Sequence, residues 1–116
     1  NVISRGTVFG TFSEEKIRAA GRVIHEEDML ELSNKIHIHR NMILVCWRIT
    51  EELIPALRVV DGVVSESGSD ISSEELKLVN DSLVWVQNVQ NARKILENDL
   101  SVTIDGEQGV IYEGII

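Results

Sequence analysis

The residues with the strongest metal-binding and nucleophilic chemistry in this 116-residue chain are three histidines and a single cysteine. His37 and His39 are two positions apart, so in a strand both imidazoles would lie on the same face, and His25 could supply a third ligand. This spacing matches no established zinc signature. Polar residues on a solvated strand or loop are the simpler interpretation, and we predict no metal site.

The single cysteine, Cys46, lies inside the apolar run of residues 42–47. One cysteine cannot form an intramolecular disulfide, which fits a reducing compartment and predicts a cytoplasmic location. A small thiol within an apolar run is typical of a core residue. We therefore predict that Cys46 is buried and has no catalytic role.

A cluster of hydroxyl and carboxyl groups occurs at Ser72-Ser73-Glu74-Glu75. Ser72 and Glu75 have the spacing of a capping box, which predicts a helix that begins here and runs to about Val79. Ser73 has no base near it in sequence that would make it a nucleophile, so its simplest role is that of a helix-start serine. The preceding SESGSD segment, residues 65–70, could bind cations or be phosphorylated, and a solvated loop is the simpler interpretation.

The composition narrows the possible partners of the chain. Eleven basic residues against 19 acidic ones give a net charge of −8, which argues against nucleic acid and anionic membrane surfaces as partners. No apolar run approaches the length of a membrane span. We expect residues 1–116 to form a single domain. Because the first residue is Asn1 rather than methionine, we also expect that domain to be excised from a larger enzyme.

Strand-like and helix-like segments alternate along the chain, which predicts an α/β fold. Apolar residues at 42–47 predict a central strand that is buried on both faces. Trp47 and Trp85 lie in apolar strand-like runs and are expected to be core or interface anchors. The expected strands cover residues 7–12, 22–24, 42–47, 59–64 and 83–86, and the expected helices cover residues 14–20, 26–33, 50–57, 72–79 and 91–96.

The segment LSVTIDGEQGVIYEG, residues 100–114, predicts a C-terminal β-hairpin. Val102 and Ile104 alternate with polar residues, as a strand with one buried face requires. Asp105-Gly106 begins a turn, and Gly109 can adopt the positive φ of a bulged turn.

The order of these segments from Gly21 to Gly114 resembles the phosphohistidine swivelling domain of phosphoenolpyruvate-utilising enzymes. It is most similar to the extra C-terminal domain of some bacterial pyruvate kinases. The similarity covers GRVI at 21–24, ILV at 43–45, PAL at 55–57, VV at 63–64, NA at 91–92 and the hairpin. The resemblance implies a swivelling β/β/α domain, with a central, mostly parallel sheet and short flanking helices. It also implies a parent enzyme that transfers phosphate from phosphoenolpyruvate to ADP with the help of Mg²⁺ and K⁺.

The family's phosphohistidine lies in a GGLTSHAA segment at a helix start. Counting back without gaps from Asn91 places this segment on residues 68–75, GSDISSEE, so that Ser73 takes the position of the histidine. Serine cannot form a phosphoramidate, and Glu74 and Glu75 would repel a phosphate. If His37 or His39 were to replace the missing histidine, the loop would need a different geometry. We therefore predict no phosphocarrier chemistry, no catalytic residue and no cofactor in this chain.

Three functions remain open. The first is a non-catalytic structural or regulatory C-terminal domain of a pyruvate kinase-like enzyme, with other domains or subunits of that parent as its partners. The second is a degenerate mobile domain of a phosphoenolpyruvate synthase or dikinase. The third is a free-standing binding module.

Overall fold

The computed structural model describes the backbone of residues 1–32 and 41–116, with the side chains of these residues except 30–32. The strands are β1 (Val2–Arg5), β2 (Val8–Thr11), β3 (Arg18–His25), β4 (Met42–Cys46), β5 (Gly62–Ser65), β6 (Val84–Gln87), β7 (Ser101–Asp105) and β8 (Val110–Glu113). The helices are α1 (Glu26–Leu32), the 3₁₀ turn η1 (Glu51–Leu53), α2 (Ile54–Leu57), α3 (Ser73–Val79) and α4 (Ala92–Ile95). None of these helices has both the length and the apolar character needed to cross a membrane.

The eight strands in the described part of the chain form one mixed sheet with the order β1-β8-β7-β3-β4-β5-β6-β2. The four central strands, β3 to β6, are parallel, and the flanking pairs are antiparallel. This confirms the predicted α/β class with a mostly parallel central sheet. The predicted hairpin is also confirmed, because β7 pairs with β8 and Gly109 has a φ of 69°.

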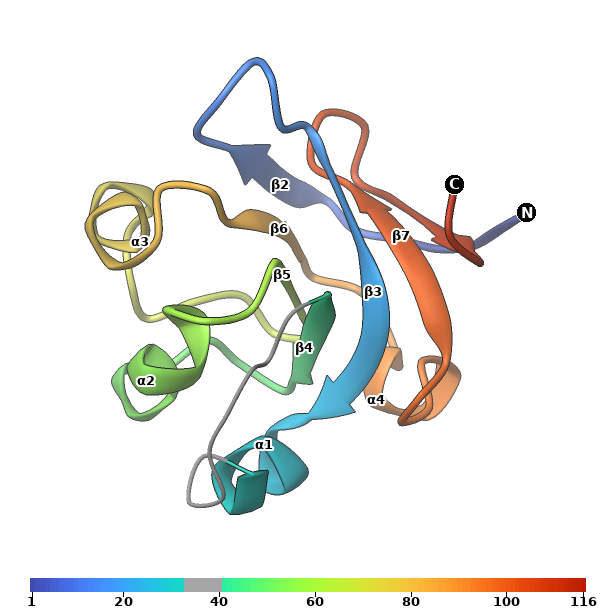
Figure 1. Ribbon diagram of the computed structural model, residues 1–116, viewed down its shortest axis with the longest axis horizontal. Helices are drawn as coiled ribbons and strands as arrows, with labels where there is room; N and C mark the ends of the chain where they lie inside the picture. The colour runs from blue at the N-terminus through green and yellow to red at the C-terminus, as the bar shows by residue number, and fades with distance from the viewer. Residues whose placement is uncertain (33–40) are drawn as a thin grey trace.

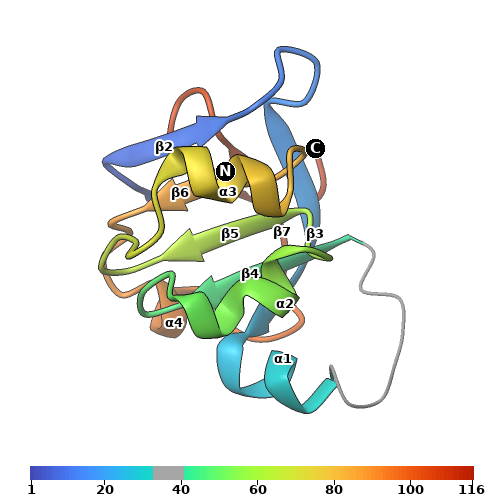
Figure 2. The same ribbon diagram turned by 90° about the vertical axis from the view of Figure 1, so that its left-hand side faces the viewer.

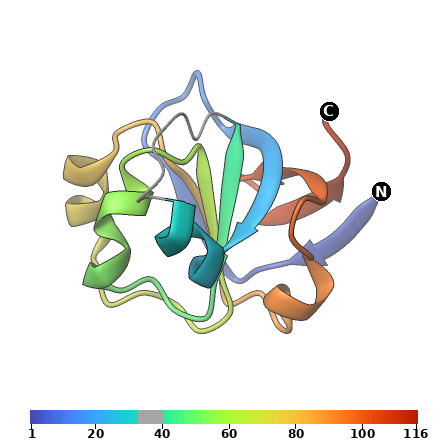
Figure 3. The ribbon, with the colours of Figure 1, turned by 60° about the horizontal axis from the view of Figure 1, so that its bottom comes forward.

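The sheet bends so that its two ends approach each other (Figure 3). Strands β1 and β2 lie at opposite edges of the strand order, yet only residues 6 and 7 separate them. The Gly6 N–H donates to the Gly109 carbonyl at 2.9 Å, which ties this connection to the hairpin turn. The result is three layers: β7, β8 and β1 on one side, the parallel strands in the middle, and α1, α2 and α3 on the other side (Figures 2 and 3).

Two hydrophobic cores share the parallel strands. One core lies between these strands and the helices, and the other lies inside the bend of the sheet. In β4, Leu44 and Cys46 face the first core, whereas Ile43 and Val45 face the second, and none of the four is exposed. A strand that is buried on both faces has no polar alternation, which explains the apolar run in the sequence.

The structure shows that the prediction of a helix over residues 14–20 was wrong. Arg18 begins the eight-residue strand β3, which pairs with β7 from Arg18 onward and with β4 from Arg22 onward. Gly21 therefore does not stop a helix. A Cβ at this position would lie 2.1 Å from the carbonyl oxygen of Asn41. The close approach of the Asn41 backbone to β3 therefore requires glycine here. Strand β1 was not predicted.

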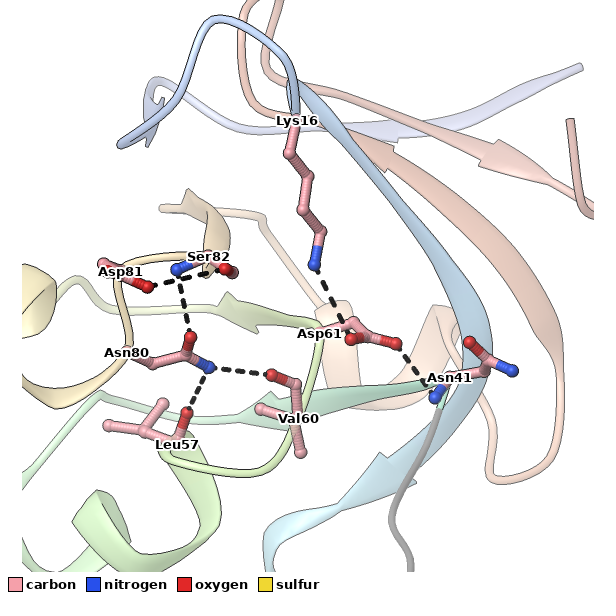
Figure 4. Close-up of polar contacts among 8 residues, drawn as sticks. All are labelled: Lys16, Asn41, Leu57, Val60, Asp61, Asn80, Asp81 and Ser82. Carbon is pink, nitrogen blue, oxygen red and sulfur yellow. Dashed lines mark hydrogen bonds and ion pairs between the residues drawn. The ribbon is translucent and has the colours of Figure 1, made fainter.

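Polar contacts join loops at the N-terminal edge of the parallel strands (Figure 4). The Asn80 side-chain amide, at the end of α3, donates to the carbonyls of Leu57 at 2.9 Å and Val60 at 3.0 Å. The Asp61 carboxylate accepts from the Asn41 backbone N–H at 2.9 Å and lies 3.6 Å from the Lys16 ammonium. These contacts fix the helix layer and the β2–β3 connection against the sheet.

Candidate functional site

The candidate site lies at the C-terminal edge of the parallel strands. The segments that follow β4, β5 and β6, with helix α4, meet at this edge, and α3 begins beside it (Figures 1 and 2). Open parallel sheets commonly bind ligands outside the carboxyl ends of their strands. The predicted helix-start serines also lie here.

The segment after β5 runs beside the segment after β4 and is hydrogen-bonded to it through the backbone. The Ser67 N–H donates to the Trp47 carbonyl at 2.7 Å, and the Asp70 N–H donates to the Ile49 carbonyl at 2.8 Å. Gly68 has a φ of 86°, a left-handed conformation that glycine adopts without steric cost. These bonds fix the chain that leads into α3.

Arg48 holds the same segment through its side chain. Its Nε donates to the Asp70 carboxylate at 2.6 Å, and its terminal nitrogens donate to the backbone carbonyls of Ser67 and Ser69. A planar guanidinium suits such multiple contacts. Sequence reasoning missed this role, because the contacts of an arginine with backbone carbonyls leave no signature in the sequence.

The start of α3 confirms the predicted cap. The Ser72 hydroxyl accepts a hydrogen bond from the Glu75 N–H at 3.2 Å and lies 3.3 Å from the Glu75 carboxylate. Ser73 is the first residue of the helix and is exposed, as are Glu74 and Glu75. The helix start therefore presents the hydroxyls of Ser72 and Ser73 beside two carboxylates. An imidazole is not present at this position.

A shallow depression of about 430 Å³ lies at the same edge of the sheet, beside α4. Its lining includes His25, Glu27, Glu66, Asn91, Arg93 and Lys94. Glu66 and Arg93 form an ion pair, and hydrogen bonding to the Glu66 carboxylate raises the pKa of Arg93. His25 Nε2 lies 2.6 Å from the Leu96 carbonyl oxygen, which fixes the orientation of the ring. Positive and negative groups are mixed here, so the lining does not favour an anion.

Cys46 and Ser65 are fully buried neighbours on β4 and β5 and lie beneath this edge. Burial raises the pKa of the Cys46 thiol, and its Sγ lies 3.7 Å from the Val64 carbonyl oxygen. A thiol that resists ionisation is a poor nucleophile. The prediction that Cys46 is a buried core residue is confirmed by its full burial. The Ser65 hydroxyl has no hydrogen-bond partner among the described residues.

The other sequence candidates have different outcomes. His37 and His39 lie outside the described residues. Across residues 1–32 and 41–116, the structure brings together no group of three or more His, Cys, Asp or Glu side chains that could hold a metal ion. Trp85 is buried, whereas Trp47 is half exposed beside the loop that leads to α3.

The fold is an α/β domain in which a bent sheet with parallel central strands carries its candidate site at the C-terminal edge of those strands. Residues 38–109 match the model of the mobile domain of PEP-utilising enzymes. The chain belongs to this family, which confirms the resemblance found in the sequence.

The relatives include proteins named as phosphoenolpyruvate synthases and proteins named as pyruvate kinases. The probable phosphoenolpyruvate synthase of Methanothermobacter thermautotrophicus is 30% identical over 84% of this chain and 14% of its own length. The pyruvate kinase of Staphylococcus aureus strain USA300 is 27% identical over 97% of this chain and 17% of its own length. That of Staphylococcus saprophyticus is 27% identical over 81% of this chain and 16% of its own length. The chain therefore spans less than a fifth of the length of these curated relatives.

Proposed function

We propose that this chain is a non-catalytic structural or regulatory domain, placed C-terminally in a pyruvate kinase-like enzyme of the cytoplasm. The parent transfers phosphate from phosphoenolpyruvate to ADP at a site outside this domain, where its Mg²⁺ and K⁺ are also bound. The observation that carries the proposal is the start of α3, where Ser73 is exposed between the Ser72 cap and two carboxylates. A helix start of this kind offers no nitrogen nucleophile and repels phosphate.

The first test is direct phosphorylation of the chain. Phosphoenolpyruvate with labelled phosphate, alone or with a phosphoenolpyruvate synthase, should leave no acid-labile phosphate on residues 1–116. The triple variant Ser73→His, Glu74→Ala, Glu75→Ala rebuilds the family's helix start and is the matched control. Acid-labile label on His25, His37 or His39 of the unmodified chain would contradict the proposal.

The second test uses the full-length natural protein with and without residues 1–116. We expect conversion of phosphoenolpyruvate and ADP to pyruvate and ATP to survive the deletion, with a changed thermal stability or effector response. If the intact protein lacks this activity, the parent is not a pyruvate kinase. A free-standing module would have no such parent protein.

A second candidate is a degenerate mobile domain of a phosphoenolpyruvate synthase or dikinase. The 30% identity to the probable synthase of Methanothermobacter thermautotrophicus favours it. This candidate predicts that the intact protein lacks pyruvate kinase activity and forms phosphoenolpyruvate from pyruvate and ATP only after the triple change Ser73→His, Glu74→Ala, Glu75→Ala restores a phosphate-carrying histidine.

A further inference from the structure

We draw no further inference here: the strongest candidate, the outer face of the β7–β8–β1 layer, carries none because Arg18 and Arg22 are already paired with Asp105 and Asp99 and nothing in the structure shows what covers this face.

Discussion

Asp105 is a buried carboxylate that organises the hairpin turn. Its side chain is 1% exposed, yet it accepts hydrogen bonds from the N–H groups of Glu107 at 2.8 Å and Gln108 at 2.9 Å. The Arg18 Nε donates to it at 3.1 Å. Burial alone would raise the pKa of Asp105, but the hydrogen bonds from Gln108, Glu107 and Arg18 outweigh burial and lower it.

A lowered folded-state pKa predicts a specific loss of stability in acid. The contribution of Asp105 is fully present above its unfolded pKa of about 3.9 and is lost as the pH falls through the lower folded-state value. We expect Asp105→Asn to cost about 1–3 kcal/mol of unfolding free energy at pH 7 and to flatten the acid limb of the stability curve. Urea unfolding between pH 7 and pH 2 measures this. Asp99→Asn changes an exposed carboxylate and is the control. Its unfolding free energy should depend on pH in the same way as that of the unmodified chain.

Ser65 shows the opposite situation, a buried hydroxyl without a hydrogen-bond partner among the described residues. Its desolvation is not compensated by a bond, so Ser65→Ala should stabilise the fold by about 1 kcal/mol. Ser69→Ala is the contrast, because the Ser69 hydroxyl donates to the Ile71 carbonyl and accepts from the Ile71 N–H. The midpoint temperature of thermal unfolding should be higher for Ser65→Ala than for the unmodified chain, and lower for Ser69→Ala. The reverse order would show that Ser65 is bonded.

At the scale of single elements, the two serines at the start of α3 should contribute differently to the stability of the fold. Ser72→Ala removes the cap of the Glu75 N–H and should destabilise the fold by about 1 kcal/mol. Ser73→Ala changes an exposed hydroxyl one residue later and should be within about 0.5 kcal/mol of neutral. Chemical unfolding of both variants tests this difference. An equal loss for both variants would mean that Ser73 makes a stabilising contact of its own.

The elements that could be predicted from sequence are those whose local signal agrees with their tertiary environment. The α3 cap and the Asp105–Gly109 turn follow from side-chain and glycine chemistry within a few residues, and both are confirmed. The segment before Gly21 has no such local determinant. Its strand forms through long-range pairing with β7, which no window of neighbouring residues contains.

The same limit applies to the candidate site. Ser72 and Ser73 could be found because a capping box is a local pattern. Arg48 and the Glu66–Arg93 pair depend on contacts between residues about 20 or more positions apart, so only the folded structure reveals them.

At the scale of the whole molecule, the two cores should unfold together because they share the strands between them. Ile43 and Leu44 are adjacent in β4 and fully buried, yet Ile43 packs inside the bend of the sheet and Leu44 packs against the helices. Removing a large aliphatic side chain from either core should cost about 2–5 kcal/mol. Because β4 cannot leave one core while it remains in the other, each loss should destabilise both.

We therefore expect Ile43→Ala and Leu44→Ala each to give one cooperative transition. Trp85 fluorescence reports on the helix-side core, since Trp85 belongs to it, and a Trp47→Phe background removes the half-exposed second indole. Far-UV circular dichroism reports on the whole sheet. In each variant the two signals should change at the same urea concentration, lower than in the Trp47→Phe parent. A dichroism change that precedes the Trp85 transition in Ile43→Ala would instead show that the β7–β8 layer unfolds independently of the helix-covered parallel strands.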